Sequence, residues 1–167
     1  KFYTVNNNTD MTEETVRLLK EWAETYHCES FIPDDPVQFP HRYTSPKDIE
    51  ISGLLTAVLS FGNRKMILRK ADELDGLMNH RPLEYILSEK WREDFRADDK
   101  SSFYRMVSHS DFRFYLEKLY SVYSEGISLE DRLLQLDGSP MQKLCAFLEV
   151  SDRSPQKKLN MFLRWMV

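Results

Sequence analysis

Apolar residues recur at helical spacing through most of the chain. The clearest stripe repeats at i, i+3, i+4, i+7 and i+8 and consists of Ile51, Leu54, Leu55, Val58 and Leu59. This spacing is typical of a helix with one buried face. Ser45 and Pro46 before the stripe predict its N-cap and first helical position, and Gly62 predicts its end.

The same spacing predicts further helices along the rest of the chain. They are expected over 12–27, 63–79, 82–88, 111–125, 129–136, 140–148 and from 155 to the end. No segment alternates between apolar and polar residues for long enough to indicate a strand. The sequence therefore predicts an all-α fold, with one continuous domain over 1–167.

One segment, 29–46, interrupts the helical pattern. Its prolines, Pro33, Pro36, Pro40 and Pro46, are incompatible with a continuous helix. We expect an extended connector held to the domain by its apolar side chains. The adjacent Asp34 and Asp35 indicate a turn or a capping pair rather than an acid–base couple.

Net charge and cysteine content restrict the partners and the cellular compartment that we expect for this protein. The 167 residues include 23 Lys and Arg against 27 Asp and Glu, for a net charge of -4. A chain of this charge binds nucleic acid only through a local basic patch. The two cysteines, Cys28 and Cys145, fit a reducing cytoplasm. No window approaches the roughly 20 apolar residues of a membrane span, so we expect a cytoplasmic protein with no membrane partner.

Most motifs of known chemistry are missing from the sequence. It contains no Gly-rich phosphate loop, no CxxC or HExxH spacing and no serine nucleophile elbow. His27 beside Cys28 gives only two of the four ligands that structural zinc requires. We therefore expect neither a metal nor a cofactor.

The junction after the clearest helix carries the first candidate site. Asn63, Arg64 and Lys65 stand at the amino end of the next predicted helix. Backbone N–H groups are free there, and cations oppose the helix dipole, so this arrangement favours a bound anion. A solvated turn whose charges pair with carboxylates elsewhere is the alternative.

The last segment, 151–167, carries the second candidate site. Arg153, Lys157, Lys158 and Arg164 outnumber its one acid, Asp152. A lysine at the edge of an apolar helix face can have a lowered pKa and act as an amine nucleophile. A surface lysine that contacts nothing is the alternative.

Four blocks of sequence resemble an uncharacterised bacterial all-helical family, whose domain has no known function. They are FIPDDPVQFPHRY at 31–43, DIEI at 48–51, SFGNRK at 60–65 and KKLNMFLRWMV at 157–167. Members of that family continue into a Pro-Leu-Asp-x-His stretch that this sequence lacks. Together with the start at Lys1 and the end at Val167 inside an apolar pattern, this predicts that the chain is truncated at the C-terminus.

That family is distantly similar to the helix-hairpin-helix DNA glycosylases. The resemblance implies a single orthogonal multi-helix domain in which Leu59 and Ser60 lead into a loop that wedges into DNA. Lys157 and Asn160 match the spacing of the catalytic lysine and a following asparagine, so Lys157 would attack the sugar C1′ after base flipping.

The same resemblance implies the DNA contacts and the missing parts. The DNA-binding residues would be Asn63, Arg64, Lys65, Lys158 and Arg164. The aspartate that assists the lysine would lie beyond Val167, so this chain would be inactive in base excision. The Gly-x-Gly turn of the glycosylase hairpin is replaced by residues 149–155.

Three hypotheses follow for the function. The first is a DNA-binding protein related to base-excision glycosylases. The second is a non-enzymatic helical protein–protein interaction module, favoured by the acidic balance and by Tyr115, Tyr120 and Tyr123 on one helix, which we expect to be exposed. The third is a small-molecule enzyme with a cleft along 34–42, where a rigid structural strap is the alternative. Clustering of Arg64, Lys65, Lys157 and Arg164 on one concave face would favour the first.

Overall fold

The structure, a computed structural model, describes residues 12–26, 28–152 and 156–166. It divides into two compact units, 1–34 and 35–167. The first unit contains helix α1, Glu13–Tyr26, and a 3₁₀ helix, η1, Glu29–Asp34. Thr12 caps α1, because its Oγ1 accepts a hydrogen bond from the Thr15 N–H at 3.2 Å. The single domain that the sequence predicts over 1–167 stays a prediction.

The second unit is mostly helical, which confirms the all-α class. Its α-helices are α2, Pro46–Leu59; α3, Arg64–Leu77; α4, Pro82–Leu87; α5, Trp91–Asp94; α6, His109–Tyr123; α7, Leu129–Leu134; α8, Pro140–Phe147; and α9, Lys157–Trp165. The glycosylase-type arrangement of these helices stays a prediction.

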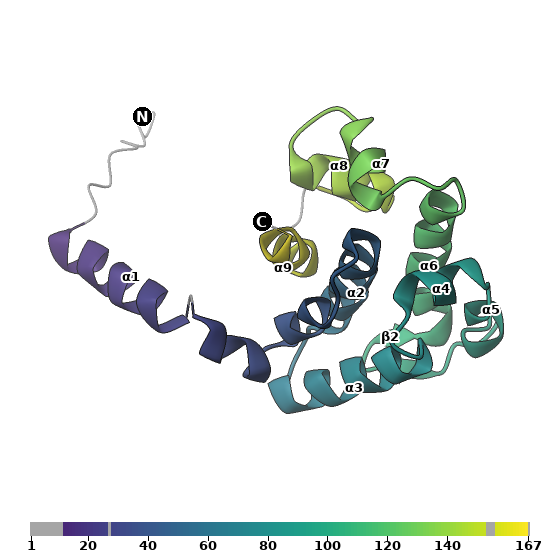
Figure 1. Ribbon diagram of the computed structural model, residues 1–167, viewed down its shortest axis with the longest axis horizontal. Helices are drawn as coiled ribbons and strands as arrows, with labels where there is room; N and C mark the ends of the chain where they lie inside the picture. The colour runs from purple at the N-terminus through teal and green to yellow at the C-terminus, as the bar shows by residue number, and fades with distance from the viewer. Residues whose placement is uncertain (1–11, 27, 153–155, 167) are drawn as a thin grey trace, which may run out of the picture. The chain divides into compact units, whose positions relative to one another are not determined.

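Helix α2, Pro46–Leu59, is the centre of the second unit, and α3, α4 and α9 pack against it (Figure 1). Every residue from 51 to 59 is buried, so the predicted stripe is confirmed and the opposite face of the helix is buried too. Gly53 permits the close approach of α9, because a Cβ atom there would lie 2.7 Å from the Met166 methyl group.

The proline-rich connector differs from its prediction. It coils into 3₁₀ turns, with η1 in the first unit and η2, Pro36–Gln38, and η3, Pro40–Arg42, in the second, instead of running extended. Proline opens η2 and η3, where its fixed φ matches a helix and its missing N–H would have no partner, whereas Pro33 lies inside η1. Asp35 accepts a hydrogen bond from the Val37 N–H at 3.0 Å, which confirms its predicted capping role.

A small hairpin is the one sheet in the described part of the chain. Strand β1, Ser102–Tyr104, pairs antiparallel with β2, Val107–Ser108. The strands are too short for alternation to reveal them, so the sequence predicted none. At the turn Arg105 adopts a positive φ of 53° and is exposed.

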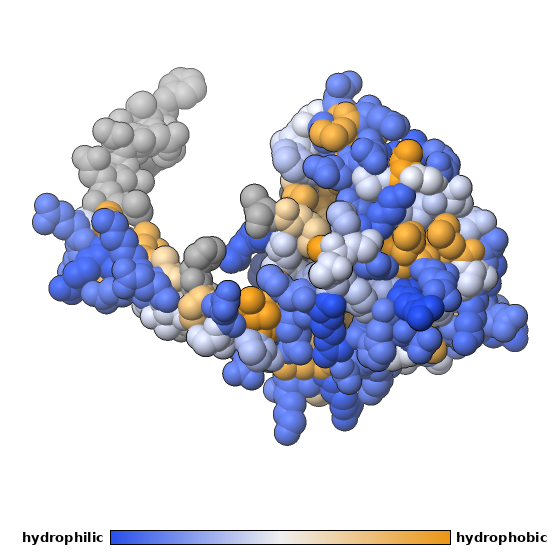
Figure 2. Space-filling model, viewed as in Figure 1, coloured by the Kyte–Doolittle hydropathy of each residue, from blue (hydrophilic) through white to orange (hydrophobic). Residues whose placement is uncertain are grey.

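The face of the second unit that Figure 2 shows is mostly hydrophilic, with hydrophobic residues in separate patches. The large apolar side chains exposed there are Phe61, Met66, Leu77, Leu87, Met106 and Leu134. Single exposed apolar residues are normal on a soluble domain, so the surroundings of each decide its significance.

Candidate functional site

The turn between α2 and α3 presents an aromatic ring to solvent. Ser60 ends α2, and its Oγ donates to the Thr56 carbonyl at 2.8 Å. Gly62 follows with a φ of 107°, and the Asn63 side chain then caps α3 by accepting from the Met66 N–H at 3.2 Å. Between them, Phe61 is left 46% exposed.

The β hairpin brings a cation to this ring. The Arg105 guanidinium carbon lies 5.3 Å from the centre of the Phe61 ring, within the range of a cation–π interaction. The guanidinium also rests on Gly62, where a Cβ atom would lie 2.7 Å from Nη1. The Tyr104 hydroxyl donates to the Phe61 carbonyl at 3.2 Å and so holds the hairpin against the turn.

The first turn of α9 brings two more cations. The Lys158 Nζ lies 5.9 Å from the centre of the Phe61 ring. Phe61, Lys157 and Lys158 all border one small hollow of about 260 Å³. Lys157 is exposed, whereas Lys158 is half-buried, and this burial lowers the pKa of its ammonium group. We call the surface formed by Phe61, Arg105, Lys157 and Lys158 the Phe61 face.

The structure brings together only part of the predicted site. Lys157 and Lys158 lie at Phe61, but Arg164 stands in the last turn of α9, near the other end of that helix. Arg64 and Lys65 are exposed at the start of α3, where Arg64 approaches Asp35 at 3.8 Å. Asn63 serves as the N-cap of α3.

Sequence reasoning missed two members of the Phe61 face. Phe61 belongs to the SFGNRK block, but the candidate site was placed on the polar and charged residues Asn63, Arg64 and Lys65 that follow it. Arg105 left no signal at all, since only the hairpin, 43 residues beyond Gly62 in the chain, brings it to the turn.

Comparison with known proteins identifies a family for this region. The family model described as Protein of unknown function (DUF2400) matches residues 35–167. The chain belongs to the DUF2400 family. No curated protein and no solved structure matches it. The matched DUF2400 region contains the whole Phe61 face and leaves out α1.

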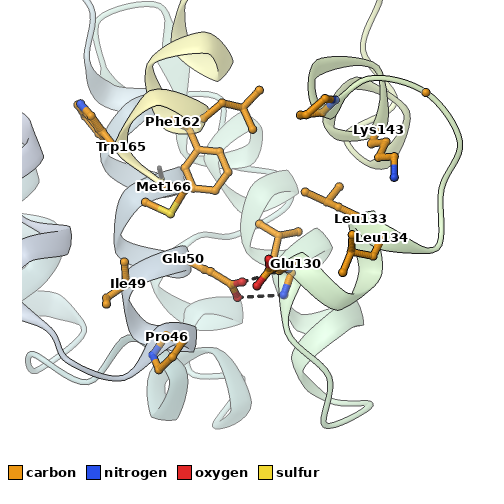
Figure 3. A pocket seen from close by; sticks show the side chains of 14 residues that line it. Pro46, Ile49, Glu50, Glu130, Leu133, Leu134, Lys143, Phe162, Trp165 and Met166 are labelled. Atoms are coloured by element: carbon orange, nitrogen blue, oxygen red, sulfur yellow. Dashed lines mark hydrogen bonds between the residues drawn. The ribbon is translucent and has the colours of Figure 1, made fainter.

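A second hollow in the DUF2400 region lies between α2, α7, α8 and α9. Its volume is about 640 Å³, and its walls are mostly apolar, with Leu133, Leu134 and Phe162 among them (Figure 3). The Glu50 carboxylate on its wall already accepts from the Leu129 and Glu130 N–H groups, at 2.9 and 3.0 Å. Glu50 therefore fastens α7 to α2, which is a structural role.

One hypothesis placed a cleft along the segment 34–42. Residues 35–42, which belong to the second unit, instead make contacts that hold the fold together. Arg42 Nη1 donates to Asp75 at 2.6 Å and to Asp72 at 2.9 Å. The neighbouring Tyr43 hydroxyl also donates to Asp75, whose side chain is 2% exposed. These bonds tie the connector to α3 and favour the strap over the cleft.

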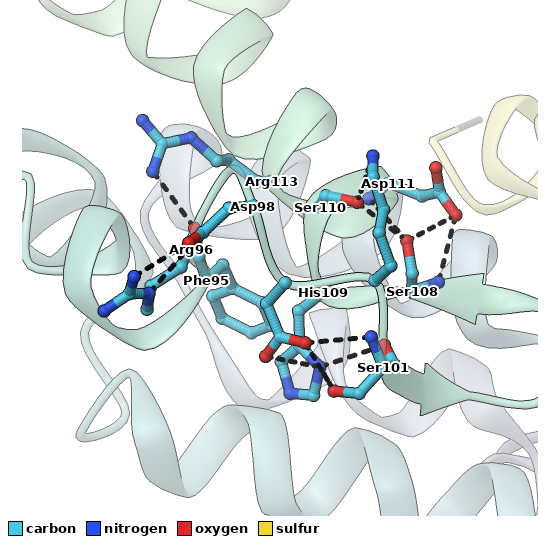
Figure 4. A network of polar contacts seen from close by, with 11 residues as sticks. Phe95, Arg96, Asp98, Ser101, Ser108, His109, Ser110, Asp111 and Arg113 are labelled. Carbon is cyan, nitrogen blue, oxygen red and sulfur yellow. Dashed lines mark hydrogen bonds and ion pairs between the residues drawn. The ribbon is translucent and has the colours of Figure 1, made fainter.

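A group of Ser, His and Asp side chains joins the hairpin to α6 (Figure 4). His109 Nδ1 lies 3.2 Å from Ser101 Oγ and 3.5 Å from Asp99, and Ser101 Oγ donates to Asp99 at 2.6 Å. A catalytic triad needs its serine and its acid on opposite nitrogens of the histidine. Here both meet the same nitrogen, so the group anchors the hairpin.

The described residues also bear on metals, redox state and membranes. They contain no group of three His, Cys, Asp or Glu side chains placed to bind a metal ion. Cys28 and Cys145 are both free, and His27 of the suggested metal pair lies outside the described residues. None of the described helices combines the length and the apolar character that crossing a bilayer requires.

Proposed function

We propose that this DUF2400 protein binds DNA through the Phe61 face, in a fold related to the helix-hairpin-helix DNA glycosylases. The observation that carries the proposal is an exposed aromatic ring with cations from two other elements beside it, Arg105 from the hairpin and Lys158 from α9. Proteins that bind unpaired or distorted nucleic acid combine a stacking ring with cations that follow the phosphates.

The local charge of the Phe61 face overcomes the acidic balance of the chain. Arg105, Lys157 and Lys158 supply three positive charges, and no ion pair within the described residues involves any of them. Asn63, Arg64 and Lys65 follow directly at the start of α3 and extend the surface along the backbone of a bound strand. Arg164 lies outside this surface and is not needed for the proposal.

The alternative of a protein–protein interaction module loses one of its supports. Tyr115, Tyr120 and Tyr123 were expected to be exposed, but Tyr123 is buried and the other two are half-buried. Tyr120 donates to Glu89 at 2.8 Å and Tyr123 to Glu50 at 2.7 Å. Tyr120 and Tyr123 thus bind α6 to neighbouring segments of the fold, and none of the three tyrosines is fully exposed.

A salt series tests the proposal. We expect the protein to bind a duplex that contains an abasic site, with the logarithm of the binding constant falling linearly as the logarithm of the salt concentration rises. Lys157→Ala should reduce the steepness of that line by about one, because one phosphate contact and its released counterion are lost. Absence of binding at low salt, where phosphate contacts are strongest, would contradict the proposal.

A cation outside the Phe61 face provides the control. Lys143 is a half-buried lysine on α8 that borders the larger hollow. Lys143→Ala removes the same charge as Lys157→Ala, so its salt dependence should equal that of the wild type. Equal losses in the two variants would show that net charge, and not the Phe61 face, determines binding.

A further inference from the structure

Two adjacent lysines at the start of α9 have different surroundings. The Lys157 side chain is exposed, whereas the Lys158 side chain is half-buried beside the Phe61 ring. In the part of the chain that the structure describes, no carboxylate lies within ion-pair distance of the Lys158 amine. An amine in this position gives up part of its hydration without gaining a counterion.

The Lys158 amine borders a hollow that can admit a small molecule. The volume is about 260 Å³, and Val58, Leu148 and Leu159 make its walls apolar. Lys157 stands on the rim as an exposed cation. The hollow therefore combines apolar walls, one half-buried amine and one solvated positive charge.

These surroundings give the Lys158 amine a larger uncharged, nucleophilic fraction than a fully solvated lysine has, although the ammonium form remains. Loss of hydration lowers the pKa of Lys158, and the positive end of the α9 dipole acts in the same direction. On α6, Tyr115 borders the same hollow, and burial together with nearby Asp111 raises the pKa of its phenol. Tyr115 thus keeps its proton and remains a donor at neutral pH.

We propose that Lys158 is a reactive amine that forms an imine with a small aldehyde carrying an anionic group, with Lys157 beside the anion. The Nζ lone pair attacks the carbonyl carbon, and the carbonyl oxygen takes up a proton to give a carbinolamine. Loss of one water molecule then forms the C=N bond. No oxidant or reductant takes part, and the step does not require DNA binding.

Trapping with pyridoxal 5′-phosphate tests this proposal on the whole chain. The aldehyde is added below the concentration of the protein, borohydride reduces any imine, and mass spectrometry of the digested protein locates the adduct. We expect the adduct at Lys158 before any other lysine. Lys158→Arg should lose it, whereas Lys143→Arg should retain it in full.

Two further arms define the roles of charge and position. Lys157→Gln removes the positive charge from the rim and should weaken the labelling of Lys158 by pyridoxal 5′-phosphate. Pyridoxal, which lacks the phosphate, should label Lys158 more weakly than pyridoxal 5′-phosphate does. An adduct that spreads evenly over the exposed lysines, or one that forms on Lys157 instead, would overturn the proposal.

The trapping result and the salt series answer separate questions. If DNA binding fails but pyridoxal 5′-phosphate still labels Lys158, the amine site stands and the DNA proposal falls. If DNA binds but Lys158 is labelled no faster than other lysines, the DNA proposal stands and the amine proposal falls. The distribution of adducts within the wild-type protein decides the amine proposal even if a variant were to unfold.

Discussion

Asp75→Ala is expected to lower the free energy of unfolding by about 3 kcal/mol, the lower end of the cost of breaking a buried ion pair. The Asp75 side chain is 2% exposed and receives hydrogen bonds from Arg42 and Tyr43, while His80 Nδ1 lies 2.9 Å away. Burial and the neighbouring Asp75 carboxylate raise the pKa of Tyr43, so its phenol keeps the proton that it donates. The substitution removes the acceptor of the Tyr43 hydroxyl and one of the two carboxylates that bind Arg42.

Asp72→Ala is the matched control, because Asp72 shares the Arg42 guanidinium but is 64% exposed. An exposed ion pair contributes about 0 to 1 kcal/mol, so this variant should unfold close to the wild type. Urea unfolding at neutral pH measures both variants. If both variants lost an equal and small amount of unfolding free energy, Asp75 would not hold the connector on α3.

Glu50→Ala is also expected to lower the free energy of unfolding by about 3 kcal/mol, because three hydrogen-bond donors lose the carboxylate that they share. The Glu50 carboxylate accepts from the Tyr123 hydroxyl at 2.7 Å and from the Leu129 and Glu130 N–H groups at the start of α7. Tyr123 and Leu129 are both buried, so water does not replace the lost bonds freely. We expect α7 to loosen from α2.

Two companion variants make the Glu50 prediction specific. Glu50→Gln keeps one acceptor oxygen in a side chain of the same length, so its loss of stability should lie between those of the wild type and Glu50→Ala. Glu130→Ala removes an exposed carboxylate from the same helix end and should change stability by less than about 0.5 kcal/mol. A Glu50→Ala variant as stable as Glu130→Ala would contradict this role.

The parts of the fold that the sequence predicts well depend on neighbours close in the chain. Helix α2 was predictable because a Ser-Pro start, an apolar stripe and a glycine stop all stand within about 18 residues. The connector was harder, since prolines exclude a long helix but allow either extended chain or 3₁₀ turns. The packing of the connector on α3 selects the turns.

The parts of the site that the sequence did not predict depend on distant contacts. Asp75 belongs to a charged stretch of α3, and its burial becomes evident only with Arg42, 33 residues earlier. Lys157 and Lys158 are adjacent residues of the same type, so the sequence does not distinguish them. The orientation of α9 on the core leaves Lys157 exposed and Lys158 half-buried. Arg105 reaches Phe61 only through the fold of the hairpin.

The most direct test of DNA binding at the Phe61 face is the affinity of Phe61→Ala for a duplex with an abasic site at one low salt concentration. Loss of a stacked aromatic ring costs about 1 to 3 kcal/mol, so the variant should bind about tenfold more weakly than the wild type. Leu134→Ala, which removes an apolar side chain that is 69% exposed beside the larger hollow, should bind like the wild type. Equal affinity of Phe61→Ala and the wild type would contradict the account.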